Sequence, residues 1–194
     1  MEPVGAPVPT VGGEPANNSL IAEIAFGLVA ADCALLVPIE ASVEARVREY
    51  LNRFRSHPPG DVDLDDDEQQ ECVALAKSLR SLLDGLGPVE FYPLVPGCGV
   101  VDAARADVTF GSALGEVKSV SRPFRASDLK QLLTYCAMAH AAGGGYDEVV
   151  LLNPRRGTRV AVSTEFLCRA TSGLTSTELF DEIQRAMVGL QTSG

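Results

Sequence analysis

Five polar residues in the second half of the chain have the types that phosphodiester chemistry requires. They are Asp107, Glu116, Lys118, Gln131 and Tyr135. Carboxylates, together with backbone carbonyls, are the ligands that Mg²⁺ or Mn²⁺ prefers in proteins. A lysine beside them can donate to the negative charge that develops on a phosphate in the transition state. The set therefore indicates metal-assisted hydrolysis of a phosphodiester bond, provided that the fold brings the five side chains together.

A hairpin is the element that would bring the first three together. Apolar and polar residues alternate over 106–110 and 113–120, which predicts two strands joined by Gly111 and Ser112. A glycine at the first of two loop positions favours a type II′ turn. In that register Asp107 faces Glu116, and directly opposed side chains lie on the same side of a sheet with Cβ atoms about 4.5–5.5 Å apart.

Two opposed carboxylates need a cation between them. At about 5 Å they repel by roughly 3 kcal/mol at an effective dielectric near 20, against a total domain stability of about 5–15 kcal/mol. Lys118, two residues beyond Glu116, points to the same side and supplies part of the charge, and a divalent ion would supply more. The alternative is an ordinary amphipathic strand whose Glu and Lys are solvated on its outer face.

A helix after the hairpin can complete the site. It is expected to begin near Ser127, a good N-cap residue, with Asp128 in its first turn. Gln131 and Tyr135 are spaced i, i+4 and therefore share one face of this helix. Taken alone, Tyr135 would be interpreted as a core aromatic.

The order of these motifs resembles the active-site core of the PD-(D/E)xK nuclease superfamily, in the version of its RecB-like and McrC-like members. The resemblance covers 89–162, although Ala106 stands where the family often has proline. It implies an α/β (α+β) fold with a central mixed sheet flanked by helices, a restriction-endonuclease-like core in αβββαβ order. The expected core elements are a helix at 68–83, a strand at 89–92, the hairpin, the helix with Gln131 and Tyr135, and strands at 148–152 and 159–163.

The resemblance also implies a metal site. Asp107 and Glu116 would ligate Mg²⁺ or Mn²⁺ with the help of the Val117 backbone carbonyl. Many members take a further acidic ligand from the helix before the first strand, for which Glu71 is the candidate and Glu68 the alternative.

The remaining site residues take supporting roles by the same resemblance. Lys118 would orient or activate the attacking water and stabilise the phosphate charge. Gln131 and Tyr135 would brace the site or contact the DNA backbone. Asp102 is an alternative to Asp107.

Charge limits how the chain can hold nucleic acid. The net charge is −10, but residues 101–194 carry ten basic and ten acidic groups. Within this half, Arg122, Arg125 and Lys130 flank the proposed site and are candidate phosphate contacts. The low positive charge predicts weak, salt-sensitive DNA binding by the isolated chain, with a protein partner or a homo-oligomer supplying further affinity.

Composition divides the chain into three parts. Residues 1–17 are rich in proline and glycine and lack the features of a signal peptide, which predicts a disordered tail. Residues 18–60 form a helical extension packed on the core, and residues 61–194 form the nuclease-like domain, ending in a helix over 177–190. Five cysteines without a C-x-x-C pair exclude a readable zinc site or disulfide framework, which favours a cytoplasmic location.

The helical extension begins with an apolar run. Residues 20–39 contain Glu23 and Asp32, which a membrane span would resist, so the run predicts a buried helix with a short strand near 34–37. A second, amphipathic helix is expected over 42–55.

Two functions from different classes follow. The first is a divalent-metal-dependent nuclease acting on DNA, as the cutting subunit of a larger restriction, repair or phage-defence assembly. The second is a catalytically inactive nuclease-like fold that serves as a protein–protein interaction subunit. The complete set of Asp107, Glu116 and Lys118 favours the first, and the acidic balance favours the second.

Overall fold

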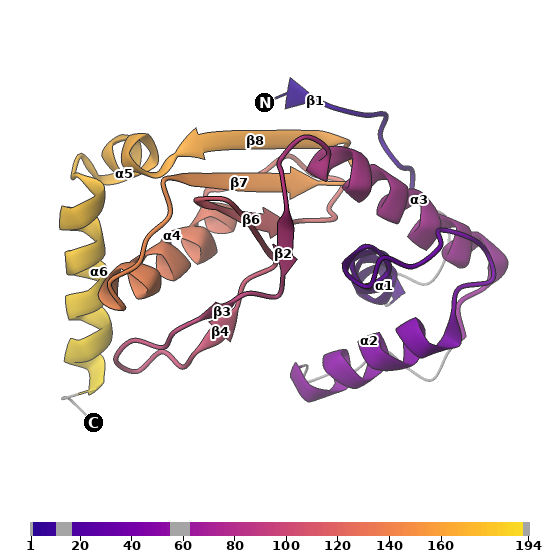
Figure 1. Ribbon diagram of the computed structural model, residues 1–194, viewed down its shortest axis with the longest axis horizontal. Coiled ribbons are helices and arrows are strands. Elements are labelled where there is room, and N and C mark those ends of the chain that lie inside the picture. The colour runs from indigo at the N-terminus through magenta and orange to yellow at the C-terminus, as the bar shows by residue number, and fades with distance from the viewer. Residues whose placement is uncertain (1, 11–16, 55–62, 192–194) are drawn as a thin grey trace.

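The protein is a mixed α+β fold in which helices cover both faces of a central sheet (Figure 1). The structure, a computed structural model, describes residues 2–10, 17–54 and 63–191. The helices in these ranges are α1 (Asn18–Ala30), α2 (Ala41–Phe54), α3 (Asp66–Leu83), α4 (Ala126–Ala141), α5 (Thr164–Ser172) and α6 (Ser176–Gln191). The strands are β1 (Glu2–Pro3), β2 (Val89–Phe91), β3 (Leu94–Val95), β4 (Ala104–Arg105), β5 (Val108–Phe110), β6 (Ala113–Val117), β7 (Glu148–Asn153) and β8 (Thr158–Ser163).

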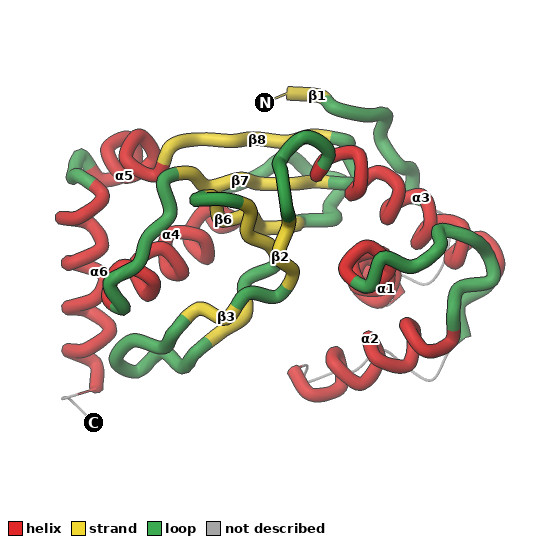
Figure 2. The backbone as a smooth tube through the Cα atoms, in the orientation of Figure 1, coloured by secondary structure: helices red, strands yellow, loops and turns green. Residues whose placement is uncertain are grey.

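The main sheet has the order β1-β8-β7-β6-β5-β2 within the described residues. Strands β6 and β7 are parallel, and the other neighbours are antiparallel. A parallel pair needs a long crossover, which is supplied here by α4. The predicted central sheet with both parallel and antiparallel strands is thus confirmed. Strands β3 and β4 form a separate two-stranded sheet that was not predicted, and Figure 2 shows its loops projecting away from the main sheet.

Two hydrophobic cores lie on opposite faces of the sheet because side chains alternate along each strand. Val150 and Leu152 of β7 belong to the core with α1, α2 and α3, whereas Val149 and Leu151 belong to the core with α4, α5 and α6. A fully buried aliphatic side chain contributes roughly 1.5–3 kcal/mol, so both faces stabilise the sheet.

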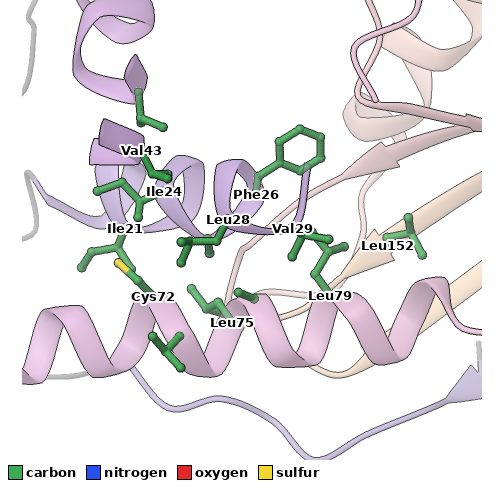
Figure 3. Close-up of a cluster of buried hydrophobic side chains, with 14 of the residues drawn as sticks. Ile21, Ile24, Phe26, Leu28, Val29, Val43, Cys72, Leu75, Leu79 and Leu152 are labelled. Atoms are coloured by element: carbon green, nitrogen blue, oxygen red, sulfur yellow. The ribbon is translucent and has the colours of Figure 1, made fainter. Parts of the chain in front are cut away.

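Helix α1 is buried on most of its surface, as its apolar sequence predicts. It lies between α2 and α3, and Figure 3 shows its side chains meeting those of α3. The labelled residues in this contact are Ile21, Leu28 and Val29 of α1 and Cys72, Leu75 and Leu79 of α3. The helix ends at Ala30, and no strand follows at 34–37 among the described residues, so the predicted short strand is wrong.

The N-terminal residues differ from the expected disordered tail. Glu2 and Pro3 pair with Arg159 and Thr158 at the edge of β8. The next residues continue along the turn between β7 and β8, where Val4 N donates to the Gly157 carbonyl at 2.8 Å and Val8 N donates to the Arg155 carbonyl at 2.8 Å. An exposed sheet edge offers unpaired backbone groups, and Glu2 and Pro3 pair with the edge of β8. The other part of the predicted tail, 11–16, lies outside the described residues.

The remaining predicted elements are found close to their expected bounds, with two changes. Helix α4 has Arg125 as its N-cap in place of Ser127, because the Asp128 carboxylate accepts a hydrogen bond from Arg125 N at 2.8 Å. Helix α5 was not predicted. No helix in the described ranges is both long and apolar enough to cross a membrane.

Candidate active site

The hairpin forms in the predicted register. Val108 pairs with Gly115, Thr109 with Leu114 and Phe110 with Ala113. Gly111 has φ +57°, the positive value that a type II′ turn needs at its first loop position. The register confirms the local prediction and places Asp107, directly before β5, opposite Glu116.

The two carboxylates are held differently. Asp107 Oδ2 accepts a hydrogen bond from Val117 N at 2.7 Å. Glu116 is 2% exposed, and its Oε1 accepts from Lys118 Nζ at 2.5 Å. The other oxygen, Glu116 Oε2, is buried and has no hydrogen-bond partner among the described residues. A buried carboxylate oxygen without a partner is costly, so this atom is the exceptional feature of the site.

Helix α4 braces the lysine from the other side. Lys118 Nζ also donates to Gln131 Oε1 at 3.2 Å, and Gln131 Nε2 donates to the Tyr135 hydroxyl at 3.2 Å. Lys118 N donates to the Leu152 carbonyl at 2.8 Å, which fixes the backbone at the end of β6. The structure therefore connects Glu116, Lys118, Gln131 and Tyr135 in one hydrogen-bonded row.

Burial and like charge dominate the electrostatics of the carboxylates. Burial, followed by the charge of Asp107, raises the pKa of Glu116 to about 7. Burial also raises the pKa of Asp107, against the opposing effects of its hydrogen bond from Val117 and of Lys118. For Lys118, burial lowers the pKa, but the charge and the hydrogen bond of Glu116 outweigh it, so the pKa is raised overall. Lys118 thus remains protonated at neutral pH.

A cavity of about 380 Å³ opens beside this hairpin. Asp107, Val117 and Lys118 line one side, and α1 lines the other with Glu23. Tyr50 of α2 and Tyr92, which follows β2, also reach it. The charges of Glu23, Asp107 and Glu116 all contribute to raising the pKa of Tyr50, after the larger effect of burial.

Glu23 is not among the residues that the sequence motifs indicate, although it has a signal of its own. A charged residue in an otherwise apolar, buried helix is rarely placed there without a reason. That signal was available in the sequence. No sequence pattern indicated Tyr50 or Tyr92, since they reach the cavity from elements far apart in the chain.

Glu71, the predicted further acidic ligand, has a different partner. Its Oε1 accepts from Arg155 Nη2 at 2.5 Å in a buried ion pair, and Arg155 Nη1 also donates to Thr10 at 3.1 Å. The alternative, Glu68, is occupied as the N3 residue of the α3 capping box and accepts from Asn17 Nδ2 at 2.9 Å. Neither carboxylate lines the cavity beside Asp107. These contacts do not support a metal-ligand role for either residue, and a helix sequence does not show which tertiary neighbour its acidic residues meet.

The predicted phosphate contacts are also revised. Arg122 Nη1 and Nη2 donate to the two oxygens of the buried Asp128 carboxylate, at 2.7 and 2.8 Å, so Arg122 supports the start of α4. Arg125 and Lys130 are exposed, but they are not among the residues that line the cavity. Asp102, the alternative to Asp107, is exposed in the loop between β3 and β4.

The residues fit a divalent cation. Glu116 Oε2 lacks a partner among the described residues, the hairpin register places Asp107 opposite Glu116, and Val117 lines the same cavity as Asp107. In the part of the chain that the structure describes, no three His, Cys, Asp or Glu side chains form a complete ligand cluster. Mg²⁺ characteristically binds through one or two carboxylates and completes its shell with water and substrate phosphate oxygens, so two carboxylates are sufficient.

Comparisons with protein-family models, with curated proteins and with solved structures return no match.

Proposed function

We propose that this chain is a divalent-metal-dependent nuclease with a restriction-endonuclease-like core. The observation that carries the proposal is the buried Glu116 carboxylate, in which one oxygen accepts from Lys118 and the other has no partner among the residues that the structure describes. The order α3, β2, β5, β6, α4, β7, with β6 and β7 parallel, supports the core assignment.

Asp107 and Glu116, with the Val117 carbonyl, would hold Mg²⁺ or Mn²⁺. Such an ion lowers the pKa of bound water and polarises a phosphoryl oxygen. Lys118, protonated at neutral pH, donates to the phosphate and stabilises its developing charge rather than accepting a proton. Gln131 and Tyr135 hold the ammonium group in place.

DNA is the proposed substrate, and the protein would work as the cutting subunit of a larger restriction, repair or phage-defence assembly, with a protein partner or a second copy. The net charge of −10 supports the need for such a partner. The same charge favours the second candidate, an inactive fold that docks a partner protein.

The test is DNA cleavage in Mg²⁺ and in Mn²⁺ with plasmid and linear substrates. We expect metal-dependent cleavage that falls at least about 100-fold in Lys118→Ala, since removing one transition-state donor costs roughly that much. Asp107→Asn removes a ligand of the proposed metal, and we expect it to abolish the metal-dependent cleavage. Lys77→Ala is the matched control, because Lys77 is an exposed lysine of α3.

A thermal shift with Mn²⁺ provides an independent measurement. A ligand that binds only the folded state raises Tm, and we expect this increase for the wild type and not for Asp107→Asn. If the wild type neither cleaves DNA nor gains stability from either metal, the interaction subunit is the better interpretation.

A further inference from the structure

A second cavity adjoins the proposed metal site. It measures about 600 Å³ and is lined by residues of α1 and α2, by Phe91 of β2 and the following Tyr92, and by Arg105 of β4. Figure 1 shows the arrangement of these elements. Glu23, Tyr50 and Tyr92 line both cavities. The two spaces are therefore neighbours, with Tyr50 and Tyr92 at their junction.

The walls of this second cavity combine aromatic rings and two arginines with small apolar residues of α1 and α2 and with Glu23. Phe91 joins the two tyrosines, and Arg46 and Arg105 contribute positive charge. Arg46 Nε donates to the Ser42 carbonyl at 3.2 Å, and Arg105 Nη1 donates to the Tyr92 carbonyl at 2.7 Å. Neither arginine forms an ion pair with a carboxylate of the described residues. Since a guanidinium has five N–H donors, each can still bind an anion.

Tyr92 has an unusual backbone. Its φ is +55°, a value that non-glycine residues adopt at a cost, and such strain clusters at functional sites. Its N donates to the Asp107 carbonyl at 3.0 Å, and its ring packs edge-on against Phe26 with centroids 5.1 Å apart. These contacts hold the Tyr92 ring at the junction and tie it to the strand that carries Asp107.

We propose that this second cavity binds an unpaired nucleotide next to the scissile phosphate, so that the substrate is single-stranded nucleic acid. The base stacks on Tyr50 and Tyr92, and Arg46 and Arg105 bind the backbone phosphate. Aromatic platforms beside positive charge are how proteins bind single strands. A base in a duplex is already stacked on both faces and cannot use such a platform without being extruded. The cavity volume is in the range of small-molecule sites.

This assignment extends the proposed nuclease function, but binding can be tested without cleavage. Fluorescence anisotropy in EDTA at low salt would compare an oligonucleotide of about 16 nucleotides with a blunt duplex of the same length. We expect the single strand to bind at least about tenfold more tightly. Tyr50→Ala is expected to weaken this binding by roughly 5- to 50-fold, and Tyr50→Phe, which keeps the ring, is expected to retain it.

The double variant Arg46→Gln, Arg105→Gln tests the cavity through residues of α2 and β4, and Arg185→Gln, at an exposed arginine of α6 that pairs with Glu182, is the control. We expect loss of single-strand affinity in the double variant and none in the control. Because α2 and β4 are separate elements, the double variant remains informative if Tyr50→Ala fails to fold.

Equal affinity for single strand and duplex, or unchanged single-strand binding in both cavity variants, would overturn the assignment. Metal-dependent cleavage that is unaffected by these variants would also overturn it while leaving the nuclease proposal intact. Single-strand binding that depends on Tyr50, in a protein that never cleaves, would support this cavity and reject the nuclease.

Discussion

Two buried carboxylates, Glu71 and Glu116, each pair with a cation, and the two pairs are built differently. Glu71 of α3 pairs with Arg155, and Glu116 of β6 pairs with Lys118, each at 2.5 Å. Arg155 is itself 5% exposed and also binds Thr10, so the first pair is enclosed by protein. Lys118 reaches a cavity, and the oxygen Glu116 Oε2 lacks a partner in the described residues, whereas no atom of Glu71 is in that condition.

The difference indicates that the Glu71–Arg155 pair is structural and that the Glu116–Lys118 pair belongs to a ligand site. A buried ion pair with its partners in place resists the removal of either member, because the other charge is left uncompensated. A buried carboxylate with an unpartnered oxygen, beside a second carboxylate, instead destabilises the folded state while it is ionised. Removing its charge, or binding a cation there, therefore raises the stability of the folded state. The same Glu→Gln change should therefore have opposite effects at the two positions.

The largest effect is expected for Glu71→Gln. This change leaves the Arg155 guanidinium buried without a counter-charge, which should lower the free energy of unfolding by roughly 3 kcal/mol. Urea denaturation at neutral pH measures it. A loss no larger than that of a surface Glu→Gln change, such as Glu182→Gln on α6, would contradict the structural role.

Glu116→Gln should instead stabilise the metal-free protein. At pH 8 the wild-type carboxylate is ionised in a buried site beside Asp107, and its folded pKa of about 7 exceeds its ordinary value. Removing the charge should raise the free energy of unfolding by roughly 1–3 kcal/mol. Urea denaturation at pH 8 in EDTA measures it, and the variant should no longer gain stability from Mn²⁺. A loss as large as that of Glu71→Gln would erase the distinction between the two pairs.

The same shift predicts the pH dependence of wild-type stability. A carboxyl group whose pKa is raised on folding binds more protons in the folded state, so stability falls as pH rises. For Glu116 the fall begins above the unfolded value of 4.5 and ends above about pH 7, and the raised pKa of Asp107 acts in the same direction. Thermal unfolding from pH 5 to 8 in EDTA should show this decline, and Mn²⁺ should reduce it. A flat profile without metal would show that neither carboxyl titrates in this range.

The smallest effect is expected for Arg122→Gln. The hydrogen bonds from Arg122 are the main reason that the pKa of Asp128 is lowered to about 2. The variant should move this pKa toward its ordinary value, which carboxyl-carbon NMR titration can measure. DNA affinity should be unchanged, since the guanidinium of Arg122 binds Asp128 in the first turn of α4. A marked loss of affinity with no change in the Asp128 pKa would restore Arg122 as a phosphate contact.

The hairpin and its register could be predicted from the sequence because they depend on local geometry. Gly111 accepts the positive φ of the turn, and strand alternation then places Asp107 opposite Glu116. The i, i+4 spacing likewise brought Gln131 and Tyr135 to one helix face, and the two side chains are hydrogen-bonded.

The partners of isolated charges could not be predicted in this way. Glu71 and Glu23 both lie on helices near the start of the chain, and only packing decides that Glu71 meets Arg155 while Glu23 lines the cavity with Asp107. Arg122 was assigned to phosphate because its loop position suggested exposure, yet it binds Asp128 in the next helix.

The sequence by itself determined the hairpin with its two carboxylates and lysine, because turn chemistry and strand periodicity act over a few residues. The tertiary structure decided what faces that hairpin. Helices α1 and α2 bring Glu23, Arg46 and Tyr50 across from it, through the packing of apolar side chains that are distant in sequence. Hydrophobic burial is non-directional, so an apolar pattern shows that a helix is buried without showing which polar residue it will carry to the site.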